Sequence, residues 1–229
     1  MVKHLLVVTT LLLLAASAAF AQESEDEAVP SLAGKHQAGA RLGAWISSGE
    51  DIPSYLEDTV NLVILETDIK SGAFYAELFY AYSILPQALI ELSLGIVNRG
   101  SVNIQVGSQQ DLGNLIVYPI LLQLKYYPLA SKGVKFQPYI SGGGGIYHGR
   151  QDVQFTTSSL YYYDLYEDTE TDINYALGGG LDWLINDKLA FEMNFKYMPI
   201  DFSNSLVTAR DYKATVVTVG VKYLYGGKK

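Results

Sequence analysis

The chain has 229 residues, of which 49% are hydrophobic, with 18 Tyr, 21 Gly and a formal net charge of −8. It has no Cys, which excludes disulfides, thiol catalysis and a lipid-modified cysteine behind a leader. The acidic balance argues against nucleic acid as a partner, because phosphates require Lys and Arg stripes. With only three His in the chain, a histidine metal site is not expected, and neither is a cofactor.

Residues 1–21 have the pattern of a cleaved signal peptide. A short basic start precedes an apolar core at 5–16 and the small-residue cleavage pattern Ala19-Phe20-Ala21. The apolar core is about a dozen residues long, whereas a membrane helix needs about 20. We therefore expect cleavage after this leader, a flexible acidic segment over 22–35, and a single domain over 36–229.

The rest of the chain contains eight segments in which apolar and polar side chains alternate. Such a period of two predicts β-strands. In the second segment, for example, Leu78 and Tyr80 share one face, while Glu77 and Phe79 share the other. The eight segments are, in chain order, about 37–46, 73–85, 88–98, 116–126, 135–148, 173–185, 189–197 and 217–225.

The connections between these segments alternate in length. Short ones lie near Leu85, Pro128 and Asn186, and long ones lie at 47–72, 99–113, 149–172 and 199–211. Short periplasmic turns and long external loops are typical of outer-membrane barrels. We therefore predict an all-β fold, an eight-stranded antiparallel transmembrane β-barrel in a Gram-negative-type outer membrane. Its partners would be outer-membrane lipid, lipopolysaccharide and the barrel assembly machinery.

One apolar run lies inside the first long connection, at residues 60–65. It either extends the second strand above the membrane or adds a hairpin that raises the strand count to ten. Extension is the simpler interpretation.

A soluble lipocalin-like barrel is the alternative, because periodicity alone does not distinguish the inside from the outside. Such a barrel would point its apolar face inward and leave charged residues such as Arg41 and Glu91 in solvent. The aromatic content of the apolar face favours the membrane, where aromatic girdles flank the apolar band. These aromatic residues are Tyr80, Tyr82, Tyr118, Tyr126, Tyr175, Trp183, Tyr197, Tyr223 and Tyr225.

If the apolar faces meet lipid, the opposite faces line the lumen. The candidate lumen residues are Arg41, Trp45, Glu77, Phe79, Glu91, Lys125, Tyr139, Asp182, Glu192, Lys196 and Lys222. Their charges balance, and the interior of an eight-stranded barrel is about wide enough for side chains to fill. Two interpretations stay open. Either a salt-bridge network seals the barrel, or a narrow path crosses it, with an apolar stretch formed by Tyr75 and the aromatic members of this set.

Several segments resemble OmpW-type outer-membrane proteins. They are LKYY at 124–127, KFQPYI at 135–140, GGGLDWLIN at 178–186, KYMPID at 196–201 and VGVKYLY at 219–225. The resemblance implies a hydrophobic channel that passes small apolar molecules and releases them sideways into the membrane. We therefore expect passive passage of small hydrophobic molecules. The alternative is a sealed structural or surface-interaction barrel that acts through its external loops.

Other motifs argue against further activities. The segment DFSN at 201–204 resembles that of barrel lipid A deacylases, but Asp201 stands where their histidine would be. Without a base the serine is not activated, so we expect no enzyme. The glycine run at 142–145 lacks the Lys-Ser/Thr ending of a phosphate loop. The acidic, tyrosine-rich segment 161–170 is interpreted as a solvated loop, with a partner or divalent cations as the alternative.

Overall fold

The computed structural model describes residues 32–48, 55–58, 63–69, 72–106, 109–156, 163–206 and 209–226. The predicted signal peptide lies outside these residues. The strands are β1 (Lys35–Ser47), β2 (Tyr55–Asp58), β3 (Val63–Ile69), β4 (Gly72–Leu85), β5 (Ala88–Val106), β6 (Gln109–Tyr126), β7 (Phe136–Thr156), β8 (Tyr163–Leu184), β9 (Leu189–Met198), β10 (Asp201–Leu206), β11 (Ala209–Asp211) and β12 (Ala214–Gly226). A single turn of 3-10 helix, η1 (Ala130–Lys132), lies between β6 and β7. Among the described residues, no helix has the length and apolar character needed to cross a membrane.

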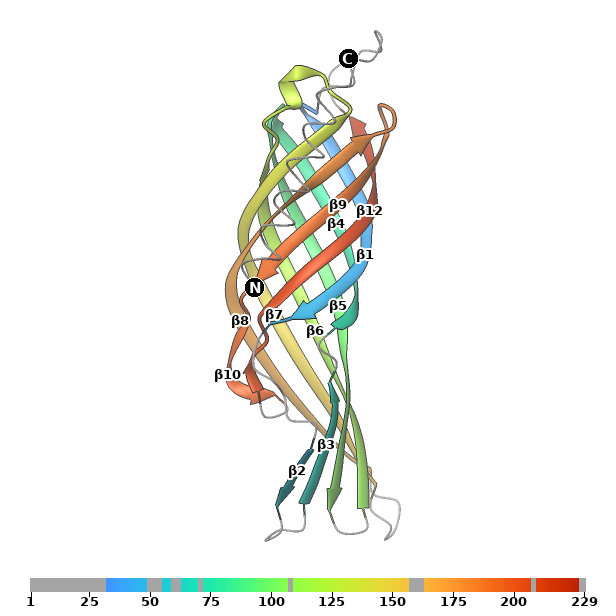
Figure 1. Cartoon of the computed structure of the whole chain (residues 1–229), viewed down its shortest axis with the longest axis vertical. Coiled ribbons are helices and arrows are strands. Elements are labelled where there is room, and N and C mark those ends of the chain that lie inside the picture. The colour runs from blue at the N-terminus through green and yellow to red at the C-terminus, as the bar shows by residue number, and fades with distance from the viewer. Residues whose placement is uncertain are drawn as a thin grey trace.

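Eight of these strands close into an antiparallel barrel (Figure 1). The order around the wall is β4, β1, β12, β9, β8, β7, β6 and β5, and β5 pairs with both β4 and β6. The first and last strands meet along their whole length, from Lys35 opposite Gly226 to Ser47 opposite Ala214. The predicted eight-stranded antiparallel barrel is confirmed.

The period-two alternation becomes an outward apolar face and an inward mixed face. On β4, the outward Phe74 is 67% exposed, while the neighbouring inward Tyr75 is completely buried. Every barrel strand exposes large apolar side chains in this way. One example from each is Leu42, Leu78, Leu94, Leu122, Ile140, Leu177, Met193 and Val219.

This outward band has the height of a lipid core. The apolar residues of β4 run from Phe74 to Ile84, which is about 25 Å along the barrel axis at the usual strand rise and tilt. At the short-turn end, His36 lies among tyrosines. Its ring stacks on Tyr225 with 5.3 Å between the ring centroids, and its Nδ1 forms a hydrogen bond with the Tyr80 hydroxyl at 2.6 Å. The soluble barrel with an inward apolar face is thereby excluded.

Four strands are longer than the alternation predicted. β5 and β6 meet at Val106 opposite Gln109, and β7 and β8 meet at Thr156 opposite Tyr163. The predicted loops 99–113 and 149–172 are therefore mostly strand, and that part of the prediction is wrong. Beyond the lipid band neither sheet face requires apolar residues. The ladder therefore continues without an alternating signal, and the extended strands project past the barrel (Figure 1).

The apolar run at 60–65 enters this projecting sheet. β3 pairs with β5, from Ile69 opposite Gly100 to Val63 opposite Val106, along the part of β5 that lies beyond its pairing with β4. β3 is thus the continuation of β4, and the predicted extension is confirmed. β2 then pairs back on β3, so the hairpin adds to the projecting sheet and not to the barrel wall.

Candidate functional site

The barrel interior has three layers, which follow from the inward positions of each strand. At the short-turn end lies the turn-end apolar cluster, which includes Leu32, Leu89, Tyr127, Tyr139, Leu184 and Leu224. The middle layer, the ionic core, consists of Arg41, Glu77, Glu91, Lys125, Asp182, Glu192, Lys196 and Lys222, all buried. At the long-connection end lies the loop-end apolar cluster: Trp45, Tyr75, Val97, Leu115, Val117, Leu121, Tyr147, Ala176, Met198, Ile200, Phe202, Tyr212, Ala214 and Val216.

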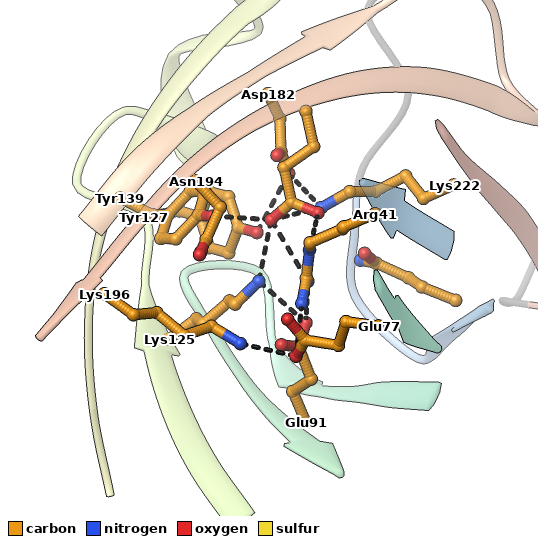
Figure 2. A network of polar contacts seen from close by, with 12 residues as sticks. Arg41, Glu77, Glu91, Lys125, Tyr127, Tyr139, Asp182, Asn194, Lys196 and Lys222 are labelled. Atoms are coloured by element: carbon orange, nitrogen blue, oxygen red, sulfur yellow. Dashed lines mark hydrogen bonds and ion pairs between the residues drawn. The ribbon is translucent and has the colours of Figure 1, made fainter. Parts of the chain in front are cut away.

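Arg41 is the hub of the ionic core (Figure 2). Its guanidinium lies 3.1 Å from Glu77, 2.6 Å from Glu91 and 2.7 Å from Glu192, with no solvent exposure. The planar fork of an arginine suits several carboxylates at once, which a lysine cannot reproduce. Arg41 therefore joins carboxylates from three different strands.

The lysines complete the network. Lys125 lies 2.7 Å from Glu91 and 2.8 Å from Glu192, Lys222 lies 2.7 Å from Asp182, and Lys196 pairs with Glu77. Four cations thus face four carboxylates, and the ionic core is neutral. Because buried charges are tolerated only when they are paired, this balance is a condition of its stability.

Aromatic side chains and tyrosine hydroxyls fill the space around the charges. The Phe79 ring centroid lies 3.7 Å from the Arg41 guanidinium carbon, and the Tyr139 ring centroid lies 4.5 Å from Lys125 Nζ. The Tyr127 hydroxyl donates to Asp182 at 2.9 Å, and the Asn194 amide donates to the Tyr139 hydroxyl at 2.6 Å. The middle of the barrel is therefore filled with side chains.

Inward glycines make room for the largest of these rings. A Cβ at Gly180 would lie 2.6 Å from the Tyr139 hydroxyl and 2.1 Å from the Met193 carbonyl oxygen. A Cβ at Gly95 would lie 2.2 Å from the Tyr75 hydroxyl. The strand opposite each tyrosine thus lacks a side chain at the point where the ring crosses it.

All of the predicted lumen residues lie inside the barrel, but they do not form one site. Trp45 and Tyr75 contact each other in the loop-end apolar cluster, with ring centroids 6.0 Å apart. Phe79 and Tyr139 instead lie against the ionic core. These four aromatic residues therefore do not form the apolar stretch of the narrow-path interpretation, because the ionic core lies between the two pairs.

The sequence analysis missed a second contribution to the loop-end apolar cluster. Ile200, Phe202 and Tyr212 come from the connection between β9 and β12, which was predicted as an external loop, yet they are buried. Phe202 and Tyr212 meet edge to face at 5.4 Å, and the Tyr212 amide donates to the Ile200 carbonyl at 2.8 Å. The only signal in the sequence was the short apolar alternation Met198, Ile200, Phe202.

The barrel wall beside this cluster contains a strand boundary that is only partly hydrogen-bonded, the boundary between β8 and the chain of β9 and β10; we call it the seam. β8 pairs with β7 along its full length, but with β9 only from Leu177 to Leu184. Beyond β9, the chain turns aside as β10 and pairs with β11. Among the described residues, no ladder joins β8 to its neighbour on the loop side of Leu177.

Side chains replace the missing ladder at this seam. The Tyr175 carbonyl accepts from the Tyr147 hydroxyl at 3.0 Å, and the Tyr175 amide donates to Asn174 Oδ1 at 2.9 Å. The Asp201 amide donates to Asp172 Oδ2 at 3.1 Å. Outward from the same stretch, Tyr175 and Leu177 are half exposed in the lipid band. At this place the wall between the loop-end apolar cluster and lipid therefore consists of the edge of β8 and the adjacent β10, which are not joined by a ladder in the described residues.

A histidine and the serine of the DFSN segment lie apart from any catalytic arrangement in the described residues. His148 Nδ1 lies 3.1 Å from Thr171 Oγ1, and Ser203 is exposed on β10. Within the part of the chain that the structure describes, no group of three or more His, Cys, Asp or Glu side chains could hold a metal ion.

An outward apolar band around a charged and packed interior defines a transmembrane β-barrel. The chain belongs to the outer membrane protein beta-barrel domain family, whose model matches residues 8–224. The family places the protein in the outer membrane, and the predicted resemblance to small outer-membrane barrels is confirmed.

Solved structures share this fold at low identity. The outer membrane protein OprG from Pseudomonas aeruginosa is 17% identical, with a TM-score of 0.51 over 88% of this chain and 100% of that chain. Ail, the attachment invasion locus protein of Yersinia pestis, solved with the heparin analogue sucrose octasulfate, is 12% identical, with a TM-score of 0.50 over 84% and 99%. No curated protein matches the sequence significantly.

Proposed function

We propose that this protein is a passive channel for small hydrophobic molecules, which enter at the loop end and leave sideways into the membrane. The observation that carries the proposal is the seam between β8 and β9, where the loop-end apolar cluster lies directly behind an unpaired strand edge. A solute that moves from this cluster into lipid stays in an apolar environment throughout. It therefore avoids the aqueous transfer that limits entry of such molecules.

The seam is also the weakest part of the wall. A side-chain hydrogen bond contributes about 0.5–1.5 kcal/mol, and among the described residues the one from the Asp201 amide to Asp172 crosses the seam. The bonds of Tyr147 and Asn174 to Tyr175 satisfy the free edge of β8 and stay in place when the seam opens. A fully paired strand boundary, such as β1 with β12, would expose a continuous row of backbone groups to lipid. Every unsatisfied group there costs several kcal/mol.

The ionic core supports a sideways exit over a straight one. A path along the barrel axis would cross the eight buried charges of the ionic core. Their ion pairs range from the close contact of Lys196 with Glu77 to 3.5 Å between Lys222 and Glu192. Separating a buried ion pair costs about 3–5 kcal/mol, and an apolar solute provides no compensating contacts. The salt-bridge network thus closes the axial route while the side of the barrel stays available.

The first experiment measures entry of a small apolar solute and of a hydrophilic solute of similar size into vesicles with and without the folded protein. Heat-shifted gel mobility verifies folding. Faster entry of the apolar solute alone is the expected result. Equal acceleration of both solutes, or of neither, would contradict the proposal.

A second experiment tests the seam itself with a reversible disulfide bond. The chain has no cysteine, so the pair Asp172→Cys and Asp201→Cys introduces a single disulfide between two positions that the hydrogen bond from the Asp201 backbone amide to Asp172 Oδ2 already brings together. Oxidation should slow apolar entry, and reduction should restore it. The control pair Ala44→Cys and Val217→Cys lies across the closed boundary of β1 and β12 and should have no effect.

A surface-interaction role is the second candidate, because β2, β3 and the ends of β5 to β8 form a sheet that projects beyond the barrel (Figure 1). Contacts with lipopolysaccharide would lie at the base of this sheet. Deleting residues 55–69 should alter cell-surface binding and leave apolar entry unchanged. Loss of apolar entry on this deletion would instead place the hairpin in the channel.

A further inference from the structure

We infer that the solutes taken up at the loop end are small amphipathic acids, with the apolar body in the loop-end apolar cluster and the carboxylate at Arg99. This inference rests on the proposed function, since the solute must enter at that end. It narrows the substrate class from apolar molecules in general to aromatic or short aliphatic monocarboxylates.

Arg99 occupies the last inward position of β5 before a break in the strand. It is 3% exposed, and its guanidinium carbon lies 5.7 Å from the Tyr212 ring centroid. The break follows at once, because Gly100 has a φ of 131° and the register shifts between Asn98 and Gly100. The outward neighbour on the membrane side, Ile96, still belongs to the lipid band. A cation is thus built in at the outer rim of the apolar cluster.

The charge of Arg99 is not part of the ionic core. Among the buried side chains of the described residues, the charged ones are the eight of the ionic core and Arg99. Arg99 is therefore a buried cation of the loop end and not a member of the ionic core. A guanidinium has five N–H donors in one plane, so it can keep a partner and still receive a carboxylate.

A second donor belongs to the same loop-end apolar cluster. Trp45 is completely buried, and its Nε1 has no hydrogen-bond partner among the described residues. Trp45 contacts Tyr75, which pairs with Val97, two residues before Arg99. The two donors therefore lie on one side of the cluster, on β1 and β5, with β4 between them. An indole N–H only donates, so a solute that fits both positions carries hydrogen-bond acceptors.

The ring that covers Arg99 comes from the β9–β12 connection and not from the barrel wall. Tyr212 lies over Arg99 and packs on Phe202. An apolar solute body can take the place of these rings without disturbing the ladders of the barrel. Recognition then combines burial of apolar surface with one charge-assisted hydrogen bond, the arrangement of small-molecule sites in general.

The test uses Trp45 as the reporter. The chain has two Trp, and Trp183 is half exposed on the outer wall. In a Trp183→Phe background, quenching by a brominated solute therefore reports contact with the interior. The probes are 4-bromobenzoate and its neutral methyl ester, titrated against the folded protein in detergent micelles.

We expect saturable quenching by 4-bromobenzoate at concentrations about tenfold or more below those needed for the ester, because hydrogen bonds to charged groups are the stronger ones. Arg99→Gln should remove this preference, and Arg99→Lys should retain part of it. Equal quenching by both probes, or an unchanged preference in Arg99→Gln, would overturn the inference. The comparison of the two probes on the Arg99 protein holds even if the Gln variant does not fold.

Entry of the neutral 4-bromotoluene into vesicles distinguishes this inference from the proposed function. Entry without any preference for the acid overturns the inference and leaves the channel standing. Saturable acid quenching without entry of any solute overturns the channel, and establishes an acid-binding site in its place.

Discussion

Replacing Arg41 by Met should destabilise the barrel strongly, because it leaves the ionic core with three cations and four carboxylates. All eight side chains are buried, so solvent does not screen the surplus charge. Removing one partner of a buried ion pair costs about 3–5 kcal/mol. That corresponds to a loss of roughly 150-fold to several thousand-fold in the folding equilibrium. Salt should rescue little of it, since buried pairs are screened much less than surface pairs.

The structure also predicts which second substitution restores stability. Without Arg41 and Glu192, each remaining lysine keeps one carboxylate: Lys125 with Glu91, Lys196 with Glu77, and Lys222 with Asp182. Arg41→Met with Glu192→Gln should therefore be more stable than Arg41→Met alone, by about 2 kcal/mol, within the usual range for coupled neighbours.

The matched control is Arg41→Met with Glu77→Gln. It has the same net charge but leaves Lys196 without its carboxylate, so it should not recover stability. The assay is urea unfolding in lipid vesicles, followed by tryptophan emission and by heat-shifted gel mobility. Equal stability of the two double variants would refute the pairing scheme. An Arg41→Met variant within about 1 kcal/mol of the parent protein would refute the role of Arg41 as the hub.

Three further tests address other parts of the interior. Gly180→Ala should lower the unfolding free energy by about 1–3 kcal/mol, because the new Cβ clashes with the Tyr139 hydroxyl. Gly142→Ala is the control and should cost little, because its Cβ would lie 3.4 Å from the nearest atom. Urea titration compares the two variants. Trp45→Ala should change the rate of apolar entry into vesicles while Phe79→Ala leaves it unchanged, because only Trp45 lies in the loop-end apolar cluster. Tyr147→Phe should speed apolar entry and lower the unfolding free energy by about 1 kcal/mol, since it removes the hydroxyl that holds the Tyr175 carbonyl; a slower rate would contradict the seam as the exit.

The inward and outward faces of the strands were readable from the sequence, whereas the pairing of charges was not. A period of two fixes which side chains share a face, and lipid on one face makes the register strict. Arg41 and Glu192, however, are 151 positions apart and meet across the barrel, not along a strand. Such contacts depend on the stagger and tilt of the closed barrel, which no local pattern encodes.

The loop-end apolar cluster was only partly predictable for a different reason. Its wall residues, such as Trp45 and Tyr75, follow from the alternation. Phe202 and Tyr212 lie in a connection, where a few apolar residues carry no signal of whether they turn inward. The seam was not predictable either, because β8 continues as a regular strand beyond the end of β9, and only the three-dimensional pairing reveals that it has lost its neighbour.

The ionic core, which stabilises the barrel, and the seam, which we propose as the exit, lie at different heights of the same barrel. The ionic core links charged residues of every barrel strand except β7, which contributes Tyr139, and it lies where each strand boundary is fully paired. Trp45 is four residues further along β1 than Arg41, about 13 Å along the strand in the direction of the loop end. The seam opens at that height, beyond Leu177, where no charge has to be separated. A barrel closed by its ionic core can therefore tolerate a weak boundary above it, because opening the seam leaves the pairs that hold the strands together intact.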